Sequence, residues 1–135
     1  MFTYSICKPL ESEIIKMSEI TSEEVMRLFE EFPWIEYLNV MNNVPEENIF
    51  YSPSLEIENK ETRHGLSISI VGDAQHYEYY IFYKRSEMRK SFFGLLEHKH
   101  ENYISEKQGQ TYQDAKSAIQ ALVIGNLNFL KENWG

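Results

Sequence analysis

The chain has 135 residues, 42% of them hydrophobic and 14% aromatic, enough to build one self-sufficient domain over residues 1–135. Its net charge of −8 argues against general adhesion to nucleic acid or an anionic membrane, because both require cationic groups that displace counterions. The single cysteine excludes an internal disulfide. Because we also find no secretory leader and no apolar stretch long enough to span a bilayer, we expect a cytoplasmic protein.

The first fifty residues contain one clear signal for the start of a helix. Thr21 stands three residues before Glu24, an arrangement in which each side chain can bond a free amide of the other residue. Apolar residues then recur at spacings of three and four until Pro33, which should end the helix. Residues 2–17 fit either a strand and a turn or a short helix, and residues 34–43 fit either a second helix or an irregular packed segment.

After residue 54 the apolar residues recur with a period of two. The stretches "LEIEN" (55–59) and "LSISI" (66–70) alternate apolar and polar residues, which predicts strands with one solvated face. The stretch "HYEYYIFYKR" (76–85) is apolar on both faces and predicts a central strand. Two further strand-like stretches, "SFFGLLE" (91–97) and "NYISEK" (102–107), follow after turns of charged residues.

A second capping arrangement marks the last helix, in which Thr111 precedes Asp114 by three residues. We expect this helix to run for roughly twenty residues, a length at the upper end for globular proteins. Its predicted inward stripe consists of Ala115, Ala118, Ile119, Leu122, Asn126, Phe129 and Leu130.

These elements together predict an α+β fold, with a four or five stranded antiparallel sheet in meander order and helices packed on one face. The helices that begin near Thr21 and Thr111 should cover the face that carries the regular apolar residues of the strands. The opposite face is open unless residues 34–50 fold over it, an alternative that the sequence leaves undecided. The predicted covered residues are Leu55, Ile57, Leu66, Ile68 and Ile70.

The open face of the predicted sheet combines acidic and aromatic residues. This mixture is typical of protein interfaces, in which aromatic side chains anchor a partner and charges at the rim select and accelerate the encounter. The candidate binding surface consists of Glu56, Glu58, Glu78, Tyr80 and Phe82.

The stretch "LEHKHENY" (96–103) raises the question of a metal site. In the expected hairpin register His76 lies opposite His98, so that these two residues and His100 could offer three nitrogens to zinc. A His-x-His pair in a polar turn is also an ordinary solvated loop, and Lys99 would repel a cation. We therefore predict no metal and no other cofactor, with these three histidines as the candidates if one is found.

Basic residues gather at the opposite end of the predicted sheet. Arg85, Arg89 and Lys90 could clamp a phosphate or a carboxylate, because arginine makes planar bidentate contacts with such groups. The alternative is that these residues form a polar turn and protect a sheet edge from pairing.

The charge is unevenly distributed, with a net −10 over residues 1–83 and +2 over residues 84–135. No G-x-S-x-G elbow and no Gly-rich phosphate loop occurs in the chain. We therefore predict a small acidic non-catalytic protein that binds a basic protein partner, in the manner of an inhibitor or immunity-type factor. The alternative is a small-ligand or metal-dependent enzyme with its site at one end of the sheet. Neither membrane nor nucleic acid is expected as a partner, and a homo-oligomer is left open.

Overall fold

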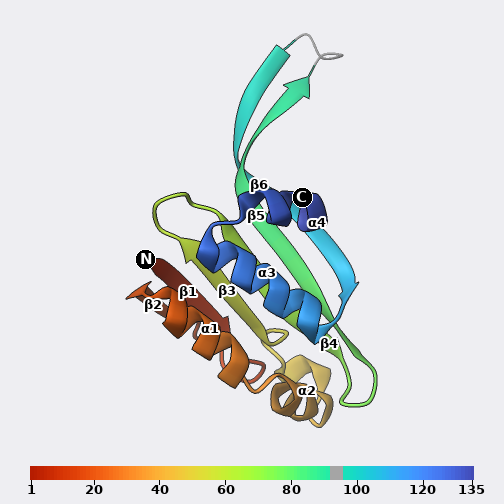
Figure 1. The fold of residues 1–135 in the computed structure, drawn as a ribbon. Helices are drawn as coiled ribbons and strands as arrows, with labels where there is room; N and C mark the ends of the chain where they lie inside the picture. The colour runs from red at the N-terminus through yellow and green to blue at the C-terminus, as the bar shows by residue number, and fades with distance from the viewer. Residues whose placement is uncertain (92–95) are drawn as a thin grey trace.

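The computed structural model of the protein describes the backbone of residues 1–91 and 96–135 and the side chains of residues 1–86 and 103–135. Over this part of the chain the fold is α+β, with four α-helices and a six-stranded antiparallel sheet in the order β2-β1-β3-β4-β5-β6 (Figure 1). The predicted class is confirmed, whereas the predicted four or five strands is too few. The strands are β1 (Phe2–Cys7), β2 (Ile15–Ile20), β3 (Ser54–Asn59), β4 (Gly65–Gly72), β5 (Tyr77–Ser91) and β6 (Leu96–Gln110).

The additional strands come from the N-terminal segment that the sequence left undecided. β1 and β2 form an antiparallel hairpin, and β1 also pairs along its other edge with β3. Phe2 therefore has Ile20 as its register partner on one side and Asn59 on the other. Only β3 to β6 follow the predicted meander, because the chain passes through two helices before it returns to pair with β1.

The last hairpin is longer than predicted. The charged segment 84–90, which the sequence favours as the turn after the third predicted strand, continues β5. Tyr83 pairs with Ser105, so the expected hairpin register, with His76 opposite His98, is wrong. This segment contains no Gly, Pro, Asn or Asp, so none of its residues favours a tight turn. The predicted break between the stretches 91–97 and 102–107 is likewise wrong, because β6 runs without a break from Leu96 to Gln110. Residues 92–95 of the first stretch lie outside the described residues.

The helix starts follow the capping residues. Thr21 and Thr111 each form a complete capping box, and their hydroxyl oxygens accept hydrogen bonds from the Glu24 and Asp114 amides at 3.2 and 3.1 Å. The predicted twenty-residue helix is divided in two, because Gly125 adopts a left-handed conformation with φ of 76°. The helices are α1 (Ser22–Glu31), α2 (Trp34–Asn42), α3 (Tyr112–Ile124) and α4 (Leu127–Trp134), with a short 3-10 turn η1 (Glu46–Asn48).

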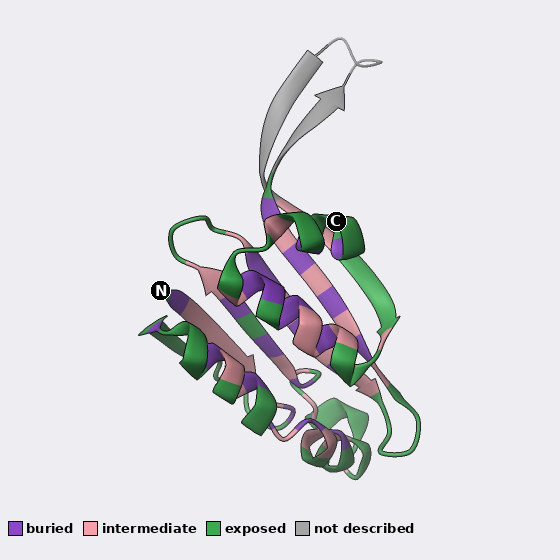
Figure 2. Cartoon of the chain, viewed as in Figure 1, coloured by how far each residue is buried: buried purple, intermediate pink, exposed green. Residues whose placement is uncertain are grey.

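One hydrophobic core joins the strands to the helices. α3 packs against β4 and β5, α4 against β5 and β6, and α1 against α3 (Figure 1). Along β3, β4 and residues 77–85 of β5, buried residues alternate with less buried ones (Figure 2), as a strand with one packed face requires. The predicted covered residues Leu55, Ile57, Leu66, Ile68 and Ile70 are all 0–1% exposed and belong to this core.

The segment after α1 joins the same core. The Trp34 ring makes an edge contact with Tyr79 at 5.4 Å between centroids, and Leu38 is fully buried. The break at Gly125 changes the predicted inward stripe, because α4 presents different residues to the sheet. Asn126 and Phe129 are exposed, in contrast to the prediction, whereas Leu130 is buried.

Candidate functional site

The side chains that alternate with the buried strand residues form a second sheet surface, which we call the outer face. Its central row runs across five strands through the register partners Ser5, Glu56, Ser67, Phe82 and Glu106. Neighbouring rows carry the other predicted residues: Tyr80 pairs with Ser69, Glu78 with Val71, and Glu58 with Gly65. The five predicted binding residues therefore lie on β3 and β5, on either side of the small side chains of β4.

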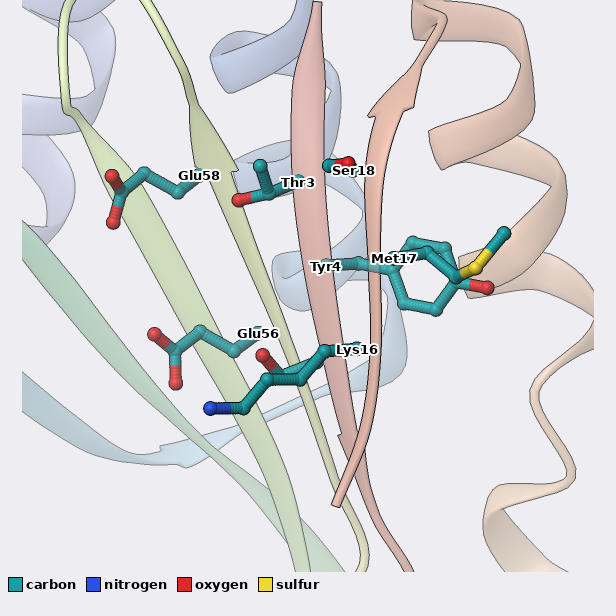
Figure 3. A pocket seen from close by; sticks show the side chains of 8 residues that line it. Thr3, Tyr4, Lys16, Met17, Ser18, Glu56 and Glu58 are labelled. Atoms are coloured by element: carbon teal, nitrogen blue, oxygen red, sulfur yellow. The ribbon is translucent and has the colours of Figure 1, made fainter.

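A hollow of about 370 Å³ lies on the β2 side of the outer face. Figure 3 shows that the carboxylates of Glu56 and Glu58 project in one direction, away from the side chains of Tyr4 and Met17. The Lys16 ammonium reaches toward Glu56 (Figure 3), but the two form no ion pair among the described side chains. The lining residues are Thr3, Tyr4, Ser5, Lys16, Met17, Ser18, Glu56 and Glu58.

A second hollow, of about 270 Å³, lies on the β5 side of the same face. Gly65 lines this hollow and contributes no side chain to its row between Glu58 and Lys84. Phe82 and Ile104 provide the apolar walls, and Ile104 is 55% exposed. The lining residues are Glu56, Gly65, Leu66, Ser67, Phe82, Lys84 and Ile104, so Glu56 borders both hollows.

The two acidic side chains between the hollows differ in their electrostatic state. Glu58 Oε1 accepts a hydrogen bond from Arg63 Nε at 2.5 Å, and Glu58 Oε2 is bonded to the Lys84 ammonium. Burial raises the pKa of Glu58, but the bonds and charges of Lys84 and Arg63 outweigh it and lower that pKa overall. Glu58 is thus ionised and internally neutralised. Glu56 forms no ion pair with any described side chain, so its charge faces outward.

The predicted anion-binding residue Arg85 lies within β5 and not in a turn. Its guanidinium carbon is 4.6 Å from the ring centroids of both Tyr83 and Tyr103, and the side chain is 5% exposed. Its Nη1 donates to the Tyr83 carbonyl oxygen at 3.2 Å and to Ser105 Oγ at 2.5 Å. Arg89 and Lys90 are the other two predicted residues. The structure does not describe their side chains.

Two residues beside Arg85 are not among the predicted site residues. His64 from the β3–β4 turn and Lys131 from α4 line the same cavity as Arg85. Burial first, and the nearby Arg85 charge second, lower the pKa of His64. No sequence pattern links these two positions, because they lie far apart in the chain and meet only through the packing of α4 on β5.

The predicted grouping of the histidines is wrong in its geometry. His98 is the register partner of Arg89, and His100 that of Glu87. His76 immediately precedes β5 and is thirteen residues from Arg89, the register partner of His98. At about 3.3 Å per residue of extended strand, the two positions are roughly 40 Å apart. His76 cannot therefore share a metal with the other two, whose side chains lie outside the described set. Among the described side chains no group of three metal-binding residues is present.

No helix in the described part of the chain is long and apolar enough to cross a membrane. Comparison with protein-family models, with curated proteins and with solved structures found no significant match.

Proposed function

We propose that the protein is a non-catalytic binding protein that uses its outer face to hold a segment of a basic protein partner. The segment would place an apolar side chain in the hollow walled by Phe82 and Ile104 and a lysine or arginine beside Glu56. The observation that carries this proposal is the position of Glu56, which borders both hollows and has no ion-pair partner among the described side chains.

The proposal requires that the outer face is accessible, with the helices covering only the opposite face of the sheet. In support, the buried residues of all four helices join one core with the alternate strand residues, and no described residue of 34–50 lines either hollow. An apolar side chain in the second hollow would remove the exposed Ile104 and half-buried Phe82 surfaces from water, which favours association.

Charge adds selectivity to this contact. The net −10 of residues 1–83 would attract a basic partner over distances beyond the contact itself and accelerate the encounter at low salt. Because Glu58 is already neutralised by Lys84 and Arg63, the local specificity would rest on Glu56. A protein of this kind would act by occupying a basic surface of its partner, as an inhibitor or immunity-type factor does.

The enzyme alternative receives less support from the geometry. It placed a metal-dependent or small-ligand site at one end of the sheet, with His76, His98 and His100 as the metal candidates. The register separates His76 from the other two by most of the length of β5.

The sharpest test is a selection of random peptides on the purified native protein. We expect enriched peptides to carry lysine or arginine next to an aliphatic or aromatic residue, and to bind more weakly as salt is raised. Binding should be lost in Glu56→Lys and strongly reduced in Phe82→Ala. The matched control is Glu61→Lys, which makes the same charge change at an exposed turn outside both hollows.

Two results would overturn the proposal. One is a set of enriched peptides without basic residues. The other is binding that Glu56→Lys and Glu61→Lys reduce equally, which would show that overall charge and not the outer face governs recognition. Circular dichroism and thermal unfolding of each variant would establish that the fold is intact before binding is compared.

A further inference from the structure

A third cavity, of about 190 Å³, lies apart from the outer face and has a different chemistry. It is bounded by the β3–β4 turn, by β5 and by α4. Three of its lining side chains carry or can acquire a positive charge, and none of the lining residues is acidic. The lining residues are His64, Tyr83, Arg85, Ser86, Leu127, Asn128 and Lys131.

Arg85 is fixed in position at the wall of this cavity. Its guanidinium lies between the Tyr83 and Tyr103 rings, and its bonds to the Tyr83 carbonyl and to Ser105 Oγ prevent rotation of the group. Ser105 is itself held, because its hydroxyl donates to the Trp134 carbonyl oxygen at 2.5 Å. A cation that is already ordered loses little side-chain entropy when an anion arrives, and low local polarity strengthens its field.

His64 and Lys131 provide donors from the two other sides. The Tyr83 hydroxyl occupies Nδ1 of His64 at 2.6 Å, which fixes the ring and leaves Nε2 without a hydrogen bond among the described residues. The Lys131 ammonium likewise has no ion-pair partner among the described side chains. The Asn128 amide lines the same cavity and can donate as well.

We propose that this cavity binds the phosphoryl group of a phosphate monoester, held by Arg85, Lys131 and His64. A tetrahedral anion suits the site better than a planar carboxylate, because the donors come from three separate chain segments. The proposal does not depend on the outer face, which could bind a partner whether or not this cavity is occupied.

Sulfate is the probe, because it is a tetrahedral dianion whose charge does not change over the range in which histidine titrates. Binding is measured by calorimetry and by thermal unfolding at constant ionic strength, with acetate and chloride for comparison. We expect saturable binding of sulfate and of inorganic phosphate, and weaker binding of acetate. Glycerol phosphate and a phosphoserine peptide would then distinguish a small-molecule source of the phosphoryl group from a peptide source.

Three variants connect the binding to the cavity. Lys131→Gln should weaken sulfate binding about tenfold, the effect of one hydrogen bond to a charged group. His64→Gln should remove the increase in affinity that the native protein shows as the pH falls. The other titratable and charged groups that line the cavity, Tyr83, Arg85 and Lys131, are unchanged in this variant. Lys8→Gln, which removes a lysine outside this cavity and outside both hollows of the outer face, should change neither.

The proposal fails if sulfate stabilises the protein no more than chloride at equal ionic strength. It also fails if Lys131→Gln and Lys8→Gln weaken sulfate binding equally, or if the pH dependence survives in His64→Gln. Arg85 is left unchanged in these variants because its burial between two rings makes loss of the fold the first effect of replacing it.

Discussion

His64 Nδ1 lies 2.6 Å from the hydroxyl oxygen of Tyr83, so a residue of the β3–β4 turn is bonded to a buried side chain of β5. Burial, and second the charge of Arg85, lower the pKa of His64 from its usual value of 6.5. The folded protein therefore binds fewer protons than the unfolded chain between the folded-state pKa and 6.5. The contribution of neutral His64 to the free energy of unfolding is fully present above pH 6.5. It is lost as the pH falls through the pKa that His64 has in the folded protein.

The first prediction follows from the direction of this pKa shift. The free energy of unfolding of the native protein should fall more between about pH 7.5 and about pH 5 than that of His64→Gln. Urea unfolding at the two pH values measures the difference. The other three histidines are common to both proteins, so parallel losses of stability would contradict an effect of His64.

The second prediction concerns the contact of α3 with the sheet. Leu122 is 1% exposed and belongs to the core, so Leu122→Ala should lower the free energy of unfolding by about 2–5 kcal/mol. Ile124, two residues further, is 74% exposed, and Ile124→Ala should stay within about 0.5 kcal/mol of the native value. Urea unfolding of the two variants should separate them clearly. Equal effects would mean that the end of α3 does not pack as described.

The third prediction uses two glycines with positive φ. At Gly72, φ is 118° and an added Cβ would lie 2.2 Å from the His76 carbonyl oxygen, so the turn could not close without moving. Gly109 has φ of 68° but nothing within 4 Å of the Cβ position. Gly72→Ala should therefore destabilise the protein by more than Gly109→Ala, whose cost is about 1–2 kcal/mol of left-handed backbone strain. Thermal unfolding that ranks the two variants in reverse would refute the described turn.

The fourth prediction concerns a buried polar atom. Trp34 Nε1 is buried and has no hydrogen-bond partner among the described residues, while the ring packs against Phe29, Phe32 and Tyr79. Trp34→Phe removes this unsatisfied donor and keeps a ring, so we expect a change within about 1.5 kcal/mol. Trp34→Ala should cost about 3–5 kcal/mol, because it opens a cavity. A loss on Trp34→Phe as large as that on Trp34→Ala would show that the indole nitrogen has a partner.

Local patterns in the sequence were sufficient for the helix starts and for the strands with one buried face. The capping residues Thr21 and Thr111 and the alternation in 55–59 and 66–70 act within a few residues, so their structural meaning is readable without the fold. The alternation also placed Glu56 and Phe82 on one surface, two strands apart.

Features that depend on register or on distant packing were not readable in the same way. Charged residues suit both an exposed turn and a solvated strand, so the sequence of segment 84–90 does not reveal that β5 continues through it. The register of the histidines depends on that continuation. The neutralisation of Glu58 by Lys84, and the meeting of His64 with Lys131, arise from pairing and packing between segments far apart in the chain. A single sequence contains no local signal for either.

The position of β1 between β2 and β3 has a consequence for the order of folding. One edge of β1 can pair with β2 by forming a short hairpin. The other edge can pair with β3 only after the chain between Cys7 and Ser54 has closed a long loop. Such closure carries a larger entropic cost and slows folding. Until it occurs, the unpaired edge of β1 is a site at which another unfolded molecule could add a strand, so refolding yield should fall as protein concentration rises.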